Sequence, residues 1–120
     1  MIATAGCLNG RTSSDRTIRM TGDFGFDPEM TTIETGQTVT WVNSSDVDHT
    51  ITAYEAEIPD GATYFASGGF ESERAARERL SEGLVPPDSE YEHTFETAGT
   101  YEYYCVPHES SEMVGTVRVE

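Results

Sequence analysis

The chain has 120 residues, the length of one domain, which is enough to bury a hydrophobic core without disulfide bonds. It carries 22 acidic residues against seven arginines and no lysine, so its formal net charge is −15. This charge argues against nucleic acid as a partner, because the phosphate backbone requires a basic surface, and no apolar run approaches the roughly 20 residues that span a bilayer.

The acidic excess predicts adaptation to high salt. Dense negative charge keeps a protein soluble, but the like charges on its surface repel one another. At molar salt the Debye length falls to about 3 Å, so this repulsion is screened. The alternative is an ordinary acidic protein whose carboxylates are simply solvated.

Residues 1–16 are expected to form a flexible tail or tether, since they are polar, rich in Gly, Ser and Thr, and show no periodicity. Within them the run TAGC, which ends at Cys7, resembles the lipid-attachment box of exported lipoproteins, although Thr4 stands where leucine is usual. Cys7 is therefore a candidate lipid anchor. The alternative is an unpaired cysteine in a frayed chain end.

Residues 17–120 are expected to form a single all-β domain. Period-two alternation of apolar and polar residues, bounded by Gly, Pro, Asn and Asp, predicts half-buried strands. Val39 and Trp41 share a face of one such strand. Several strands in succession predict a two-sheet sandwich. The expected strands are 17–20, 30–35, 38–43, 49–54, 91–95, 100–105 and 113–119.

One segment, residues 71–83, predicts a short helical insertion at the edge of the sandwich. It is rich in helix formers, with Ser72 at the N-cap position and Gly83 beyond the last turn. Arg74 and Glu78 are four residues apart and can form an exposed ion pair, worth about 0.3–0.5 kcal/mol. The arginines of this helix form either a solvated face, which we favour, or a docking patch.

A thiol, an imidazole and a thioether stand close together at Cys105, His108 and Met113. Pro107 stiffens the loop between the first two by fixing its own φ and restricting the residue before it. A second imidazole would complete a trigonal set, and His49 is the candidate because it opens an expected strand at a point where neighbouring strand ends meet. Two histidines, a thiolate and a weak axial thioether are the ligands of a blue-copper electron-transfer site.

Three classes of function compete for these residues. An electron carrier would use all four. An enzyme could use a Cys–His nucleophilic pair, but no oxyanion site is recognisable, and His93, the remaining histidine, cannot build a three-histidine copper centre. A zinc- or copper-binding storage module without a redox role would accept two imidazoles and a thiolate, but it has little use for Met113. We expect His93 to be structural and Tyr104 to pack as an aromatic with a polar tip.

The run AGTYEYYCVPHESSEMVGTVRV (98–119) resembles the C-terminal ligand loop of the plastocyanin-like cupredoxins, in which cysteine, histidine and methionine have this spacing. The run GQTVTWVNSSDVDHTI (36–51) resembles the earlier strand pair and first histidine of that family. The resemblance covers roughly residues 24–120. With the acidic balance, the insertion FASGGFESERAARE and Cys7, the chain most resembles the halocyanins, small blue copper proteins of halophilic archaea.

This resemblance implies a Greek-key β-sandwich with one type 1 copper per chain, held by His49, Cys105, His108 and Met113. It implies a monomer, not an enzyme, that exchanges single electrons transiently with membrane respiratory redox proteins as donor and acceptor. Its expected place is outside the cytoplasm, attached to the outer face of the cell membrane. Many relatives carry asparagine after the first histidine, where its side chain ties the two ligand loops together. Thr50 stands there in this chain, and a threonine hydroxyl can take over that role.

We expect the electron to leave through the ring edge of His108. Molar salt screens long-range steering by the acidic surface. Docking should then depend on a small apolar patch around His108, formed by Phe24, Phe26, Pro107 and Val114.

Overall fold

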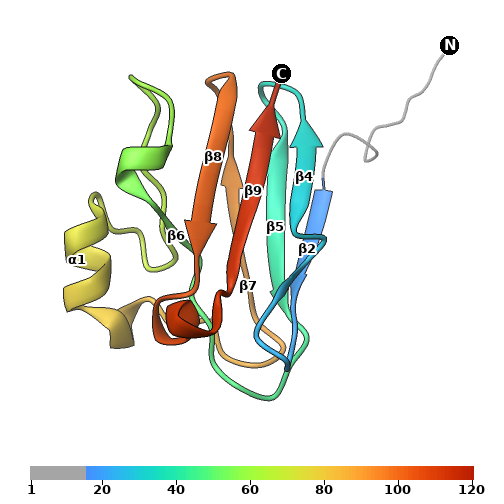
Figure 1. Cartoon of the computed structure of the whole chain (residues 1–120), viewed down its shortest axis with the longest axis vertical. Coiled ribbons are helices and arrows are strands. Elements are labelled where there is room, and N and C mark those ends of the chain that lie inside the picture. Colours follow the sequence, from blue (N-terminus) through green and yellow to red (C-terminus); the bar gives the residue numbers. More distant parts are fainter. Residues whose placement is uncertain (1–15) are drawn as a thin grey trace, which may run out of the picture.

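Two four-stranded β-sheets pack face to face in residues 16–120, the part of the chain that the computed structural model describes (Figure 1). The first sheet has the order β3 (Phe26–Asp27), β2 (Arg16–Met20), β5 (Thr38–Asn43) and β7 (Glu90–Thr94). The second has the order β4 (Met30–Ile33), β9 (Val114–Val119), β8 (Gly99–Tyr104) and β6 (Thr52–Ala53). The predicted all-β sandwich is confirmed.

The strand pairing within the sheets is mixed. β5 with β7 and β8 with β9 are antiparallel, whereas β2 with β5 and β4 with β9 are parallel. A parallel pair cannot be joined by a tight hairpin, so the chain passes from β2 through β3 to β4 in the other sheet before it returns in β5. As a result, the end of β8, the start of β9 and the loop after β5 all lie at the same end of the sandwich, the lower end in Figure 1.

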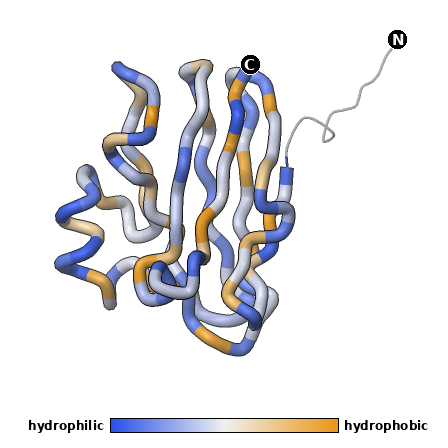
Figure 2. The backbone as a smooth tube through the Cα atoms, viewed as in Figure 1, coloured by the Kyte–Doolittle hydropathy of each residue, from blue (hydrophilic) through white to orange (hydrophobic). Residues whose placement is uncertain are grey.

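Alternating strand residues form the core, as the period-two pattern predicts. In β5, Val39, Trp41 and Asn43 are buried. The Trp41 ring lies 5.3 Å from that of Tyr103 and 6.0 Å from that of Phe65, measured between centroids. Large aromatic rings bury about 150–250 Å² each, so this cluster supplies much of the apolar burial. Figure 2 shows apolar segments along the strands and a largely hydrophilic helix at one side.

The helical insertion is present, but it is shorter than predicted. It comprises α1 (Glu73–Glu78) and the 3-10 turn η3 (Leu80–Glu82) in place of one helix over 71–83. The Ser72 side chain accepts a hydrogen bond from the Ala75 N–H at 3.1 Å, which confirms the predicted N-cap.

The helix ends early because the chain turns back toward the sandwich. Arg79 leaves the helical region, with φ −116° and ψ 46°. The following turn brings Gly83 against Ser67, whose buried hydroxyl donates to the Gly83 carbonyl at 2.6 Å. On the outer side of α1, Arg74 and Glu78 form the predicted exposed ion pair at 3.1 Å.

The strand predicted over 49–54 is also shorter than expected, since only β6 forms there. His49 lies outside it, in an isolated bridge with Val85. The Thr50 N–H points to the sulfur of Cys105 and not to a neighbouring strand. The polar groups of this segment therefore serve the site described below.

The predicted tail, 1–16, lies outside the described residues except for Arg16, which begins β2. Cys7, the candidate lipid anchor, also lies outside them. Within residues 16–120, none of the helices has the length and apolar character needed to cross a bilayer.

Candidate metal centre

The predicted ligands of the C-terminal loop lie between β8 and β9. Cys105 directly follows β8, and His108 lies in the 3-10 segment η4 (Val106–Ser111). Met113 directly precedes β9. The Cys105 N–H donates to the Met113 carbonyl at 3.0 Å, and the Met113 N–H donates to the His108 carbonyl at 3.3 Å. Backbone hydrogen bonds therefore close the loop that carries three of the four predicted ligands.

His49 joins this loop from the other side of the site. Its Nδ1 lies 3.7 Å from Cys105 Sγ, and His108 Nδ1 lies 3.2 Å from the same sulfur. One ligating atom from each of these three side chains lies within 4.8 Å of the others. His49, Cys105 and Met113 are each 0% exposed, so water reaches neither sulfur atom.

Burial controls the protonation of these groups. It lowers the pKa of His49, and the neighbouring His108 lowers it further. Burial also lowers the pKa of His108. Burial raises the pKa of the Cys105 thiol, against the opposing effect of the Thr50 hydrogen bonds. The site thus offers two neutral imidazoles with free lone pairs, and a sulfur that a bound cation would convert to thiolate.

The hydrogen bonds around His49 direct its Nδ1 toward the sulfur. Ser45 Oγ lies 3.0 Å from His49 Nε2. The hydroxyl proton of Ser45 is directed to acceptors that have no proton to give, namely Asn43 Oδ1 at 2.6 Å and the Val47 carbonyl at 3.1 Å. Ser45 Oγ must therefore accept from Nε2–H, which leaves the lone pair of Nδ1 free to bind a metal.

Asn43 and Ser45 are two further residues of the site that the sequence motifs did not indicate. Asn43 is fully buried, and its side-chain amide donates to the carbonyls of Val47 at 2.7 Å and Val85 at 2.8 Å. A signal was available, because Asn43 continues the inward-facing series of Val39 and Trp41 in β5. A polar residue at an inward position of a strand must find partners, and here it orders the loop that leads to His49.

Thr50 ties the two ligand segments together through its hydroxyl, in the role that asparagine has in many relatives. The Val106 N–H donates to Thr50 Oγ1 at 2.8 Å. The Thr50 N–H in turn donates to Cys105 Sγ at 3.3 Å. Thr50 is 2% exposed, so both contacts are shielded from water. A hydrogen bond to the sulfur stabilises its thiolate form.

His108 is the half-buried member of the group and lies nearest the solvent. The ring of Phe24 stacks on it, with a centroid separation of 4.3 Å and an interplanar angle of 21°. Phe24 is 36% exposed and has a left-handed backbone with φ 63°. Phe26 was predicted to share this surface, and that prediction is wrong. Phe26 is 5% exposed because it points into the core, where its ring packs edge-on against Tyr103 at 4.7 Å.

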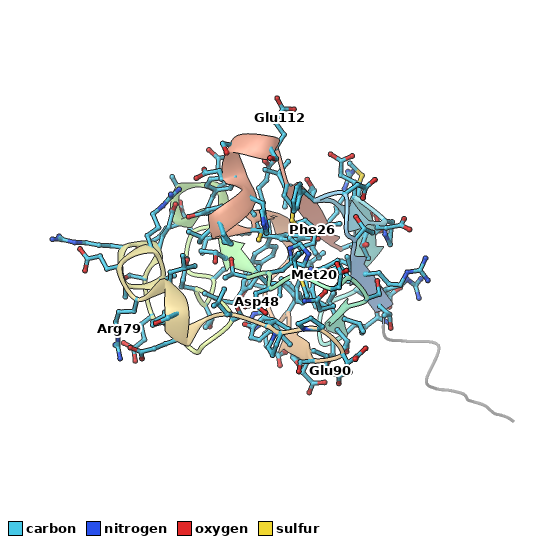
Figure 3. All side chains as sticks on the ribbon, turned by 90° about the horizontal axis from the view of Figure 1, so that it is seen from below. Met20, Phe26, Asp48, Arg79, Glu90 and Glu112 are labelled. Carbon is cyan, nitrogen blue, oxygen red and sulfur yellow. The ribbon has the colours of Figure 1, made fainter. Side chains whose placement is uncertain are left out.

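Figure 3 looks onto this end of the molecule, with Met20 and Phe26 near the middle. Glu112 and Glu90 point outward at opposite edges, and Asp48 lies between them. All three acidic residues are exposed.

His93 and Tyr104 lie outside the group of ligating atoms. The His93 ring stacks on Phe65 at 4.7 Å and meets Phe95 edge-on at the same distance, as expected for a structural histidine. Tyr104 is fully buried and stacks on Tyr54 at 4.1 Å, while its hydroxyl remains hydrogen-bonded. It therefore packs as predicted.

The donor atoms suit copper in both of its common oxidation states. A buried thiolate and a thioether are soft ligands for Cu(I), and imidazoles bind both Cu(I) and Cu(II). Zinc would be satisfied by the imidazoles and the thiolate alone. The pair of shielded sulfur atoms therefore favours copper.

Known proteins resemble this chain in both sequence and structure. Residues 15–120 match the family described as copper binding proteins, plastocyanin/azurin family. A plastocyanin of Scenedesmus fuscus is 38% identical over 109 residues, covering 88% of this chain and 100% of that protein. A purple cupredoxin from Nitrosopumilus maritimus superposes with a TM-score of 0.60 at 27% identity, covering 87% of this chain and 98% of that one. A pseudoazurin from Sinorhizobium meliloti superposes with a TM-score of 0.65 at 22% identity, covering 88% and 73% of the two chains.

Proposed function

This chain belongs to the plastocyanin/azurin family of copper-binding proteins, and from that premise we propose that His49, Cys105, His108 and Met113 are the ligands of its copper. Cupredoxins of this family are electron carriers and not enzymes, and they bind one copper ion. The observation that carries the ligand assignment is the approach of three ligating atoms to within 4.8 Å of one another, beside a buried methionine.

Bound copper supplies one-electron exchange between Cu(I) and Cu(II). The residues of the chain hold the ligands in place during that exchange. Thr50 fixes the Cys105 side against the His49 side, and Ser45 fixes the ring of His49. Because these hydrogen bonds and the surrounding core are rigid, the ligands need to move little when the charge of the site changes.

The electron's route to a partner runs through His108. It is the ligand nearest the surface, and Phe24 covers one side of its ring. The docking surface is the region around it, formed by Phe24, Pro107 and Val114, without Phe26. Transient redox encounters bury less than about 1,200 Å², which a patch of this kind can provide.

The finer assignment is to a halocyanin, and it is supported by composition. A net charge of −15 with no lysine suits molar salt, where repulsion between carboxylates is screened. The partners are then membrane respiratory redox proteins, and the protein is a monomer held by a lipid on Cys7 at the outer face of the cell membrane. Mass spectrometry of the membrane-extracted protein tests the lipid. A chain that remains folded in dilute buffer would contradict the adaptation to salt.

The absorption spectrum tests the proposed copper site. Protein loaded with Cu(II) should be intensely blue, and the colour should disappear on addition of reductant. Cys105→Ser removes the thiolate and should abolish the band, whereas Ser110→Ala, an exposed change in the same loop, should keep it. A zinc- or copper-storage module without a redox role would instead be colourless, or coloured but not reducible.

A further inference from the structure

Arg77 joins the insertion helix α1 to the loop of the proposed copper site. Its guanidinium forms a two-point ion pair with Glu109, the residue after His108. Nη1 lies 3.0 Å from Oε1 and Nη2 lies 3.2 Å from Oε2. Nε donates to Glu73 Oε2 at 3.1 Å. A planar, bidentate ion pair fixes the relative orientation of its partners in addition to the electrostatic attraction between them.

The same guanidinium also contacts the strand that leads to Cys105. It lies over the ring of Tyr104, 4.7 Å from the centroid. The Tyr104 hydroxyl donates to Glu73 Oε2 at 2.9 Å, and the hydroxyl of the stacked Tyr54 donates to Glu109 Oε2 at 2.9 Å. We call Tyr54, Glu73, Arg77, Tyr104 and Glu109 the Arg77 cluster. It holds the residue before Cys105 and the residue after His108.

Partial burial separates this cluster from an ordinary surface ion pair. The side chains of Arg77, Glu73 and Glu109 are 42%, 21% and 34% exposed. Those of Arg74 and Glu78, on the outer side of the same helix, are 87% and 62% exposed. The outer pair therefore matches the solvated face predicted from the sequence, as does the Arg79–Glu82 pair with side chains 59% and 56% exposed. Contacts that are bidentate, partly covered and joined in a network restrain their partners more than isolated, fully exposed pairs do.

The backbone of the loop is irregular at His108, so a contact from outside adds to the restraint that the loop's own hydrogen bonds supply. Although η4 spans Val106–Ser111, His108 interrupts it with non-helical backbone angles, φ −123° and ψ 19°. Short 3-10 segments have poor hydrogen-bond geometry and hold their shape weakly. Arg77 of α1 contacts this loop through its ion pair with Glu109.

We propose that Arg77 is a positioning residue of the copper site, which acts from the insertion helix by clamping Glu109 and Tyr104. The clamp restrains the backbone on either side of Cys105 and His108. The proposal rests on the proposed function for the identity of the metal, but the restraint of the loop is a property of the chain itself. The competing explanation is that Arg77 only attaches α1 to the sandwich.

Hydrogen exchange of backbone amides separates these explanations. The loop amides of His108, Glu112 and Met113 donate to the carbonyls of Cys105, Glu109 and His108. The α1 amides of Ala76 and Arg79 donate to the carbonyls of Ser72 and Ala75. Exchange would be measured on the full chain, both loaded with Cu(I) and free of copper, together with the rate of copper loss to a Cu(I) chelator.

Arg77→Met, which keeps the aliphatic stem, should speed exchange of the loop amides by roughly fivefold to tenfold and copper loss by a similar factor. Arg77→Lys keeps the charge without the planar fork and should lie between wild type and Arg77→Met. Arg74→Met is the matched control and should stay within about twofold of wild type. Glu109→Gln should reproduce the effect of Arg77→Met on the loop, and the double variant should be less than additive.

The proposal is overturned if Arg77→Met speeds only the α1 amides, since Arg77 would then serve the helix alone. An equal acceleration in β8 and β9 would indicate a global loss of stability and would also overturn it. So would loop exchange indistinguishable from that of Arg74→Met. If the wild-type protein is not blue with Cu(II), the proposed function is wrong. Hydrogen exchange measured on the copper-free protein would still decide the role of Arg77.

Discussion

Thr50→Val removes the hydroxyl that ties the two ligand segments together. Valine keeps the branching of threonine at Cβ, so the substitution changes the hydroxyl and leaves the shape of the side chain nearly the same. It deprives the Val106 N–H of the acceptor it meets at 2.8 Å. It also removes the acceptor of the Thr52 hydroxyl, at 3.3 Å. The Thr50 N–H to the Cys105 sulfur is kept, since it belongs to the backbone.

The expected cost follows from leaving a shielded donor without a partner. An unsatisfied buried polar group costs about 1–3 kcal/mol, and the valine side chain returns little of this. For a chain of this size, each kcal/mol lowers Tm by roughly 3–5 °C. We therefore expect the free energy of unfolding of the copper-free protein to fall by about 1–3 kcal/mol and Tm to fall by several degrees.

Thr31→Val is the matched control for this experiment. Thr31 is 5% exposed, and its hydroxyl has no hydrogen-bond partner among the described residues. The same chemical change should therefore be neutral or stabilising there. Both variants would be measured by thermal and denaturant unfolding at one fixed high salt concentration. If Thr50→Val is as stable as wild type, or if Thr31→Val loses as much, the hydroxyl does not tie the loops in the way described.

Substitutions at three further positions probe the ligand set, the docking surface and the dependence of stability on pH. Met113→Leu should raise the reduction potential by about 60 mV or more, because leucine cannot donate to Cu(II), and voltammetry that finds no shift would remove Met113 from the axial position. Aspartate and asparagine both tolerate the left-handed φ of 63° at position 24. Phe24→Asp should slow electron self-exchange in molar salt about tenfold more than Phe24→Asn does, and both variants should keep the blue band. Equal self-exchange rates would contradict docking at this face. Burial lowers the pKa of His93 below its ordinary value of 6.5, in a hollow that Glu71 and Tyr91 also line. As pH falls, His93 of the unfolded chain therefore takes up a proton before His93 of the folded chain does. Folding stability is then lost as pH falls below about 6.5. His93→Phe should therefore show a shallower loss of unfolding free energy between pH 7.5 and 5.5 than wild type, and parallel curves would mean that His93 contributes nothing to it.

The local features of this protein could be predicted from its sequence because their causes are local. The burial pattern in β5 follows from alternation, since successive side chains of a strand point to opposite faces. Cys105, His108 and Met113 are close in the chain, so one tight loop is enough to bring them together. The N-cap at Ser72 likewise depends only on the three residues that follow it.

Contacts across the chain depended on how the sheets pack, and the sequence pattern alone could not place them. His49 and Cys105 are 56 residues apart, and they meet because β5 and β8 end at the same side of the sandwich. Alternation did not reveal that Phe24 covers His108 while Phe26 enters the core. Phe24 lies in a tight turn and Phe26 begins the two-residue strand β3, which is too short to show a periodic pattern. The ion pair between Arg77 and Glu109 could not be predicted either. An arginine on a polar helix face has the same sequence pattern whether that face contacts solvent or a loop.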